Sequence, residues 1–534
     1  MSDICAVTIL AILEKMRHQL DRLGMTSPAS ITKGTGRFPP LYRWPLFCFS
    51  IFALKFLLFA IDPAPKLYLG DSGSYIWTAL SGSIPPDRSF FYGYVIRWTA
   101  LWTGSLTWLM VVQVCLSAIT CILFSSVTRV IFELPERWSY VFGFLCAIDP
   151  LQLLYERYVM TEAISLFLYA FVIYHSFLYL KTRRLRNLVI VQAASVFLIG
   201  FRMSFLLQVQ IDTIILPLLA FAPDVLKQIR RRPLAEASFT SPGRVCAGHL
   251  LLSVMLMFLL HAGYKRTNGW LSHREPDYLY STGTTLLAYW APVLQAEDAP
   301  DPRLADLIRR GDEFHLKNPV FRNAQRFRPG HLIDRLRKLE PDRAKADSLA
   351  KKTALHALWR DPLGVLGIGC RTYVGYWNVA AMKRCAESDF SFRRPPDDNL
   401  MALLASRFHL SYSKGTIMSP TQLYYVAAWP YYFLILLAPL LSGLAIALRS
   451  VRRYAILLFV HISIMMAMAM TFGSDSIRYL QPISFMTLLV LALGAKIALR
   501  SVRKDEAVAG GQSSSVETLR PPLSALAQPA FTGS

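Results

Sequence analysis

The 534-residue chain contains few charged residues, because Asp, Glu, Lys and Arg together make up only 17% of it. Hydrophobic residues make up 54%, which is too apolar for a typical soluble protein and predicts a membrane protein. Acids are the scarcer charged residues, with 35 Asp and Glu against 57 Lys and Arg. The basic residues cluster where apolar segments end, which is how membrane topology is encoded. We therefore do not expect binding to nucleic acid.

Other familiar signals are also missing. The eight cysteines include no CxxC pair and no Cys/His cluster with zinc-finger spacing. Cys370 and Cys385 could form a disulfide, since both fall in a segment that we expect outside the cytoplasm. The first 20 residues lack a small-residue cleavage site, so they are a poor signal peptide and predict an interfacial amphipathic helix instead. No internal repeat is visible.

Long apolar segments are abundant. A bilayer span needs roughly 20 predominantly apolar residues. Ten segments are candidates, at residues 44–61, 104–127, 138–154, 160–180, 188–204, 206–226, 247–263, 424–447, 454–472 and 479–499. We therefore predict an all-α polytopic membrane protein with about ten transmembrane helices.

The short loops predict the orientation of these spans. Four strongly basic loops lie on one side if the spans alternate, at residues 181–187, 227–232, 449–453 and 500–504. The positive-inside rule makes that side cytoplasmic, so we expect both termini in the cytoplasm.

This topology divides the chain into five parts. They are a cytoplasmic or interfacial N-terminal segment (1–43), a membrane module (44–263) with a first outer loop (62–103), an extracytoplasmic segment (264–423), C-terminal transmembrane helices (424–499) and a disordered cytoplasmic tail (500–534). The extracytoplasmic segment is mainly helical in pattern. It is either a folded domain or functional, because structureless loops of that length are uncommon.

The first outer loop contains a polar stretch, GDSGSYI…SGSIPPDRSFFYGYVIR (70–97). Asp71, Asp87 and Arg88 fall there among aromatic residues that include Tyr75. Its Gly, Ser, Asp and Pro residues are also ordinary turn formers, so a plain loop is the alternative. The aromatic residues 89–102 predict an amphipathic helix at the membrane surface.

A second polar stretch, DPLQLLYERYVMTEAISLFLY (149–169), follows the third span. It brings Asp149, Glu156 and Glu162 to the same membrane face, where ionisable groups are costly and often functional. The Thr161–Glu162 pair is also an ordinary helix-start signal.

Two arginines lie near the ends of other spans. Arg202 occurs in FRMSF (201–205), and Arg478 occurs in FGSDSIRYLQPISF (472–485). Arginine is a natural partner of phosphate, because its planar fork donates two parallel hydrogen bonds. Snorkelling to the interface is the plain alternative for both side chains.

Taken together, these stretches resemble the GT-C class of membrane glycosyltransferases, and above all the branch with protein O-mannosyltransferases and the lipid A aminoarabinose transferase. Asp71 follows the first span, the MTE motif with Glu162 opens the fourth, and an RYLQP motif (478–482) precedes the last. A motif similar to one of the family, ALHALWRDPLGVL (354–366), lies in the outer segment. The resemblance covers about residues 60–499. Many relatives have an Arg-Tyr or acidic pair after the first acid, whereas this chain has Ser72-Gly73-Ser74.

The resemblance implies an enzyme of the bacterial inner membrane that transfers a sugar from a polyprenyl-phosphate donor. The acceptor would be a lipid, a glycan or a protein at the extracytoplasmic face, and membrane lipids would surround the spans. Asp71 would be the general base and Glu162 a second carboxylate. The implied phosphate-binding and accessory residues are Arg478, Arg202 and Arg88, with Asp87, Asp149, Glu156 and Tyr75. A divalent metal ion is possible but is put in doubt by the missing second acid.

Three other functions remain open from sequence. A transporter or flippase usually has matching halves and broken helices at the midplane, which this sequence does not show. A polysaccharide polymerase or ligase can also have a large outer loop, but lacks an acid directly after the first span. A non-catalytic membrane scaffold is the third alternative.

Overall fold

The computed structural model describes residues 40–231, 241–388, 398–411, 418–472 and 476–516. The chain divides into two units, residues 1–48 and 49–534. The described part of the first unit forms the start of helix α2 (Pro40–Ile61). All contacts given below lie within the second unit. The interfacial helix predicted at the N-terminus lies outside the described residues.

The described part of the chain is helical, without a β-strand and with a single isolated β-bridge between Lys66 and Tyr158. Eight of its helical stretches are long and apolar enough to cross a membrane, which confirms an all-α polytopic membrane protein. These stretches are built from α2, α5 (Leu106–Ser126) with η2 (Val127–Ile131), α8 (Glu162–Thr182), η3 (Met203–Phe205) with α10 (Leu206–Arg231), α11 (Pro242–Ser272), α21 (Trp429–Ile446), α22 (Arg452–Phe472), and η8 (Ile477–Leu480) with α23 (Gln481–Val516).

Shorter helices connect and cover these stretches. They are α3 (Leu69–Ser81), α4 (Phe91–Ile96) with η1 (Arg97–Leu101), α6 (Glu136–Ala147), α7 (Pro150–Tyr155), α9 (Leu185–Phe201), α12 (Thr282–Tyr289), α13 (Pro302–Arg309), α14 (Arg322–Phe327), α15 (Leu332–Leu339), α16 (Arg343–Arg360), α17 (Pro362–Tyr376), α18 (Val379–Ser388), α19 (Asp398–Phe408) and α20 (Pro420–Ala427).

Two of the ten predicted spans differ from single spanning helices. The segment 138–154 is broken at Asp149, whose carboxylate accepts hydrogen bonds from the backbone N–H groups of Leu151 and Gln152 and so begins α7. Pro150 sits at the first position of that helix, where its missing N–H is harmless. The segment 188–204 forms α9, an apolar helix of 17 residues.

Two of the boundaries predicted from sequence, at residues 264 and 500, lie inside helices. Helix α11 continues to Ser272, past residue 264, where the sequence predicted the start of the outer segment. Helix α23 continues to Val516, where the sequence predicted a disordered tail from residue 500. Lys, Glu and Ala residues favour helix in this stretch. Cys370 is a free thiol, so the suggested disulfide with Cys385 is absent.

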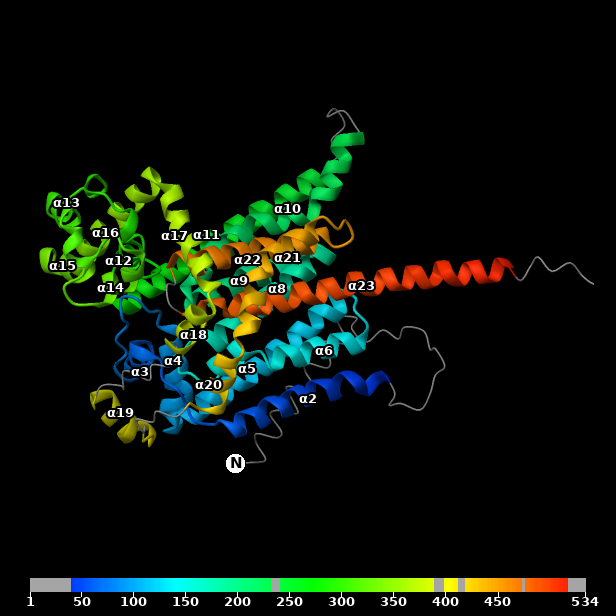
Figure 1. Ribbon diagram of the computed structural model, residues 1–534, viewed down its shortest axis with the longest axis horizontal. Helices are drawn as coiled ribbons and strands as arrows, with labels where there is room; N and C mark the ends of the chain where they lie inside the picture. Colours follow the sequence, from blue (N-terminus) through cyan, green and yellow to red (C-terminus); the bar gives the residue numbers. More distant parts are fainter. Residues whose placement is uncertain (1–39, 232–240, 389–397, 412–417, 473–475, 517–534) are drawn as a thin grey trace, which may run out of the picture. The chain divides into compact units, whose positions relative to one another are not determined.

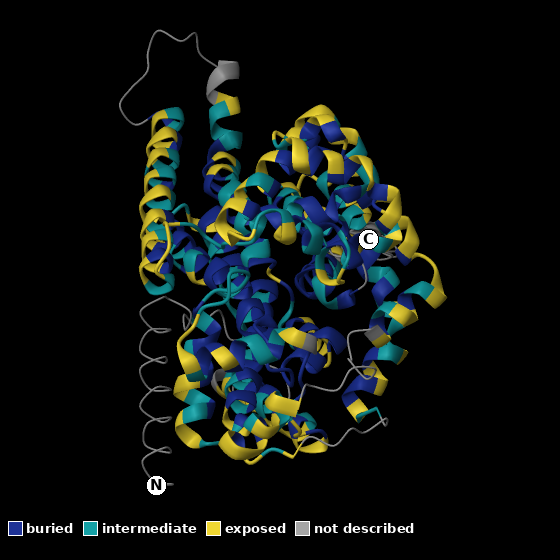
Figure 2. Cartoon of the chain, turned by 90° about the vertical axis from the view of Figure 1, so that its left-hand side faces the viewer, coloured by how far each residue is buried: buried dark blue, intermediate teal, exposed yellow. Residues whose placement is uncertain are grey.

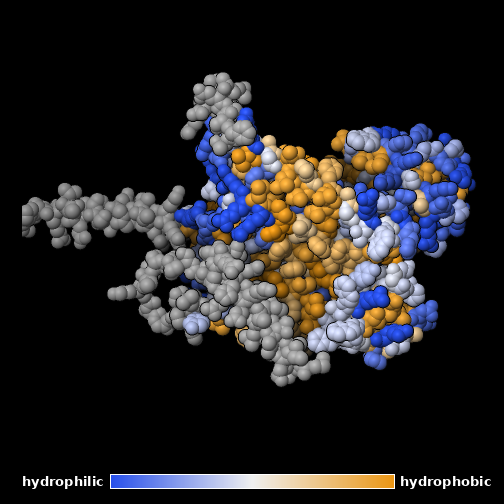
Figure 3. Space-filling view, turned by 180° about the vertical axis from the view of Figure 1, so that it is seen from behind, coloured by the Kyte–Doolittle hydropathy of each residue, from blue (hydrophilic) through white to orange (hydrophobic). Residues whose placement is uncertain are grey.

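Burial distinguishes central from outer spans. About two thirds of the most apolar window of α8 is buried, against 17% for α11. The exposed side chains of α11 include Leu251, Met255, Phe258 and Leu259. Figure 3 shows the resulting apolar surface over the long helices and a hydrophilic surface over helices α12–α16. Such an apolar exterior is expected of helices that face lipid.

Two of the predicted basic loops, at residues 181–187 and 500–504, come together at one end of the long helices. Glu133 lies 3.0 Å from Lys181, 3.8 Å from Lys496 and 3.6 Å from Arg500, measured between the paired nitrogen and oxygen atoms. Lys181 and Arg500 are exposed and their pairs with Glu133 stabilise the fold little, whereas Lys496 is buried. Together the three pairs bring the start of the loop at 181–187 beside the end of the last span.

Helices α12–α16 form a compact group around their own hydrophobic core (Figure 1). Leu287, Leu304, Leu332, Leu336 and Ala354 are fully or almost fully buried there. Figure 2 views this group face on and shows exposed residues on the outward sides of its helices. Helix α19, from the same predicted segment, packs into a different core with α3, α4 and α5.

A buried ionic network joins α2 to α7. The Lys55 ammonium lies 3.0 Å from one carboxylate oxygen of Glu156, and Arg157 Nη1 lies 2.5 Å from the other. All three side chains are fully buried. Arg157 Nε also donates to the backbone carbonyl of Asp62. Glu156 was a candidate accessory residue of the site, but its two oxygens are engaged in this structural network.

We expect Glu156→Gln to destabilise the protein by about 3–5 kcal/mol, because it leaves two buried cations without a compensating charge. The free energy of unfolding in detergent micelles measures the effect. Asp306→Asn is the matched control, since it removes a carboxylate from an exposed pair with Arg309 and should cost less than about 1 kcal/mol. Equal losses in the two variants would contradict a structural role for Glu156.

Candidate functional site

Asp71 is positioned by the way α3 begins. Backbone hydrogen bonds join Lys66 N to the Arg157 carbonyl and Val159 N to the Lys66 carbonyl, so residues 66–68 run beside residues 157–159. The Ser72 hydroxyl accepts from Tyr68 N and donates to the Val159 carbonyl. The stretch that follows is therefore a helix and not the plain loop considered from sequence. Asp71 lies in its first turn, where the helix dipole favours an anion.

Helix ends supply the other charged side chains. Glu162 is the first residue of α8, and Arg202 follows the last residue of α9 in an extended conformation. Arg478 lies in the short turn η8 before α23. Arg88 precedes α4, whose Gly93 approaches α3 so closely that a Cβ there would lie 2.4 Å from the Thr78 side chain.

These elements enclose one cavity of about 170 Å³. Its charged lining consists of Asp71, Asp87, Arg88, Glu162, Arg202 and Arg478. Tyr75 and Tyr479 also line it, and the apolar part of its wall comes from Met160, Ile199, Phe201, Met203 and Leu279. The structure therefore brings together seven of the nine candidate site residues proposed from sequence.

Asp71 is the most heavily paired of these groups. Arg88 Nη2 donates to one carboxylate oxygen, and Arg478 Nη1 donates to the other at 2.8 Å. The three side chains are 13–20% exposed. Both oxygens of the proposed base are thus held by guanidinium groups.

Glu162 faces the same arginines from the other side. Its Oε1 lies 3.4 Å from Arg478 Nε and 4.0 Å from Arg202 Nη2. The Thr161 side chain does not cap α8, and its hydroxyl lies 3.5 Å from Glu162 Oε2. Arg478 therefore bridges the two carboxylates that the sequence motifs singled out.

The sequence did not identify three residues of the site. Arg326 of α14 lies 3.6 Å from Asp87 and adds positive charge near Asp71. The rings of Tyr68 and Tyr479 lie 4.6 Å and 5.0 Å from the Arg478 guanidinium carbon, within cation–π distance. Arg326 is one of many arginines in the outer segment, so its sequence context carried no signal.

The ionisation of Asp71 follows from this environment. Burial favours the neutral acid, but Arg88 and Arg478 outweigh it and hold the pKa of the carboxyl below its usual value. For Tyr75, burial is the main cause that raises the pKa of the phenol to about 12, so it is a neutral hydrogen-bonding group at pH 7. Ionised Asp71 is consequently a weak base while both arginines hold it.

Two candidate residues lie outside the cavity. Glu156 belongs to the buried network with Lys55 described above. Asp149 caps α7 and accepts a hydrogen bond from the Tyr431 hydroxyl at 3.0 Å. The motif at 354–366 is also structural, since Arg360 pairs with Asp298 and Asp361 caps α17.

The cavity does not fit a divalent cation. Such ions require several oxygen ligands, whereas the carboxylates here share their oxygens with arginines. Among the described residues, no group of three or more His, Cys, Asp or Glu side chains converges. We therefore assign no step to a metal ion.

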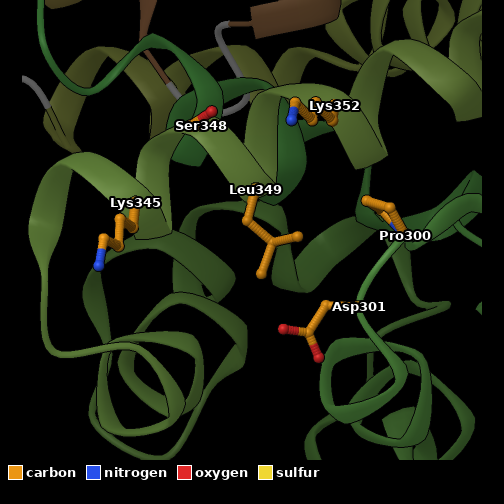
Figure 4. Close-up of a pocket in the computed structure, with 6 residues that line it drawn as sticks. All are labelled: Pro300, Asp301, Lys345, Ser348, Leu349 and Lys352. Carbon is orange, nitrogen blue, oxygen red and sulfur yellow. The ribbon is translucent and has the colours of Figure 1, made fainter.

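Another hollow, of about 320 Å³, lies on the surface of helices α13 and α16. Figure 4 shows Lys345 and Lys352 spaced along one helix, with Asp301 across from Leu349. Asp301 caps α13 and pairs with Arg303, so it has a structural role. This hollow lacks the convergence of acids and arginines found at Asp71.

Comparisons of the chain with family models, curated proteins and solved structures found no match.

The depressed pKa of Asp71 predicts a pH-dependent contribution to stability. Because the carboxyl is more acidic in the folded than in the unfolded chain, its ionisation stabilises the fold at neutral pH. This contribution is lost as the pH falls below about 4, the usual carboxyl range. We expect Asp71→Asn to lower the thermal unfolding midpoint at pH 7, with a difference from wild type that shrinks toward pH 3. A difference independent of pH would contradict the ion pairs.

Proposed function

We propose that the protein is a membrane glycosyltransferase that takes a sugar from a polyprenyl-phosphate donor. The observation that carries the proposal is the cavity where Asp71 meets Arg88 and Arg478 at the ends of membrane-spanning helices. The cavity would lie at the extracytoplasmic face of a bacterial inner membrane, opposite the basic loops. The acceptor would be a lipid, a glycan or a protein.

The charge of the cavity supports a phosphate ligand. Three arginines and three carboxylates line the cavity, and Arg326, outside the lining but 3.6 Å from Asp87, adds a fourth positive charge beside it. Within the described part of the chain, Arg88 Nε and Arg202 Nη1 are buried without a hydrogen-bond partner. Buried donors of this kind are costly unless a ligand satisfies them.

The apolar wall supports a lipid-linked ligand. Ile199, Phe201 and Met203 flank Arg202 where α9 ends, so apolar and cationic groups meet at one point. A cavity of about 170 Å³ is below the usual range of about 300–1,000 Å³ for ligand pockets. Because the cavity is small, it would receive the charged headgroup alone. The prenyl chain would continue along the apolar surface.

The proposed reaction is a displacement at the anomeric carbon of the sugar. The acceptor oxygen attacks this carbon while its proton passes to Asp71. The bond from the carbon to the phosphate oxygen breaks, and its electron pair leaves with the lipid phosphate. The transition state is expected to be oxocarbenium-like, as in other glycosyl chemistry. Arg478, Arg88 and Arg202 would stabilise the charge that develops on the phosphate.

A transporter would use a site differently. Transporters bind their substrates near the bilayer midplane, between repeated halves. The charged residues of this cavity come instead from helix ends and from the segments between helices. Their location therefore favours chemistry at the membrane surface.

We expect Asp71→Asn to reduce sugar transfer by a factor of about 10²–10⁴, because it removes the proton acceptor. The assay follows labelled polyprenyl-phosphate sugars in membranes that contain the full chain. Asp306→Asn should leave transfer unchanged, since that carboxylate is exposed and pairs with Arg309 on its own helix. Near-wild-type turnover by folded Asp71→Asn would refute the assignment of the base.

We expect Arg478→Ala to weaken use of the donor, since a hydrogen bond to a charged group contributes about 1.5–3 kcal/mol. The donor KM should rise by roughly ten- to a hundredfold. Arg478→Lys retains the charge but not the planar fork, so it should recover only part of the loss. Unchanged donor dependence in both variants would remove Arg478 from the phosphate site.

A further inference from the structure

We propose that the donor phosphate and the Asp71 carboxylate compete for Arg88 and Arg478, so that donor binding releases Asp71 to act as the base. This inference rests on the proposed function and concerns how the same site is activated. Its starting point is the double pairing of Asp71, in which each carboxylate oxygen accepts from a different arginine.

The hydrogen-bond pattern of Arg88 makes the competition direct. A guanidinium binds phosphate through two neighbouring nitrogens, either Nη1 with Nη2 or Nε with Nη2. Both arrangements include Nη2, the atom that donates to Asp71. Nη1 already donates to the backbone carbonyl of Asp87. Arg88 therefore cannot bind phosphate with two parallel bonds while Nη2 stays on Asp71.

Arg478 is constrained at one of its two pairs of neighbouring nitrogens. Its Nη1 donates to Asp71, its Nη2 donates to the Tyr479 hydroxyl at 3.2 Å, and its Nε faces Glu162 at 3.4 Å. The end-on pair of nitrogens thus includes the atom that holds Asp71. A phosphate that binds this end-on pair must take the place of the carboxylate, whereas the side-on pair, Nε with Nη2, faces Glu162 and the Tyr479 hydroxyl.

The exchange is electrostatically balanced. The phosphate diester of the donor has one negative charge, as does Asp71, so the arginines lose one anion and gain another. The released carboxylate loses its two nearest cations, and its affinity for a proton rises toward that of an ordinary carboxyl. Asp71 therefore becomes an effective base only when the donor phosphate occupies the arginines.

The exchange predicts opposite effects of one substitution on binding and on transfer. Asp71→Asn removes the competing anion, so it should bind a phosphate diester more tightly than wild type while it loses transfer. The probe is farnesyl methyl phosphate, whose single charge is constant between about pH 3 and 7. With the detergent-solubilised full chain at pH 7, we expect Asp71→Asn to bind the probe at least about fivefold more tightly than wild type. A fivefold change is at the lower end of typical coupling between sites. Equal or weaker binding by folded Asp71→Asn would overturn the exchange.

Controls separate this inference from the proposed function. Asp306→Asn makes the same change in net charge at an exposed pair and should bind the probe like wild type. Loss of transfer by Asp71→Asn without tighter binding would overturn the exchange and leave the base assignment in place. Full transfer by Asp71→Asn would overturn both.

A second measurement needs no variant. Protonation of Asp71 should release the arginines as the substitution does, so wild-type affinity for the probe should rise as the pH falls from about 4 to about 3, below the usual carboxyl pKa. The other charged groups that face the site are Asp87, Glu162, Arg202 and Arg326. Affinity that stays constant or falls over this range would show that the acids do not compete with phosphate.

Discussion

The pairing of Asp71 with Arg88 and Arg478 is the constraint on which the organisation of this end of the protein depends. It ties α3, the segment before α4 and the turn before α23 to one point. A partly buried guanidinium group is costly without an anion nearby, so Arg88 and Arg478 are each stabilised by the Asp71 carboxylate between them. The backbone bridge at Lys66 and Tyr158 sets the same geometry from the opposite side, because it aligns the start of α3 with the start of α8.

This arrangement links stability and chemistry in opposite directions. The two arginines that stabilise ionised Asp71 also lower its affinity for a proton, which a general base requires. A site of this kind becomes reactive only when something else satisfies the arginines. In the proposed glycosyltransferase the lipid phosphate binds the arginines. Without the donor, the Asp71 carboxylate would stay paired with Arg88 and Arg478. Groups with perturbed ionisation often lie at functional sites for this reason.

Much of the helical fold could be predicted from hydropathy, since a span is defined by a run of apolar residues. The break at Asp149 was harder to predict, because Pro150 and a capping carboxylate interrupt an apolar segment without lowering its overall hydropathy. Within the cavity, Asp71, Glu162 and Arg478 were found because each lies beside a span end in a recognisable motif. Arg326 has no such context, and only the packing of α14 brings it near Asp87.

Glu156 and Glu162 show why sequence could not separate structural from functional acids. They are six residues apart, both are buried, and both pair with basic residues. The turn between α7 and α8 sends them in different directions. Both oxygens of Glu156 are occupied by Lys55 and Arg157, and all three side chains are fully buried. Glu162 lies at the wall of a cavity, where its arginine neighbours also have nitrogens available to a ligand. Access to a space that a ligand can enter, rather than burial or pairing, therefore distinguishes the functional carboxylate.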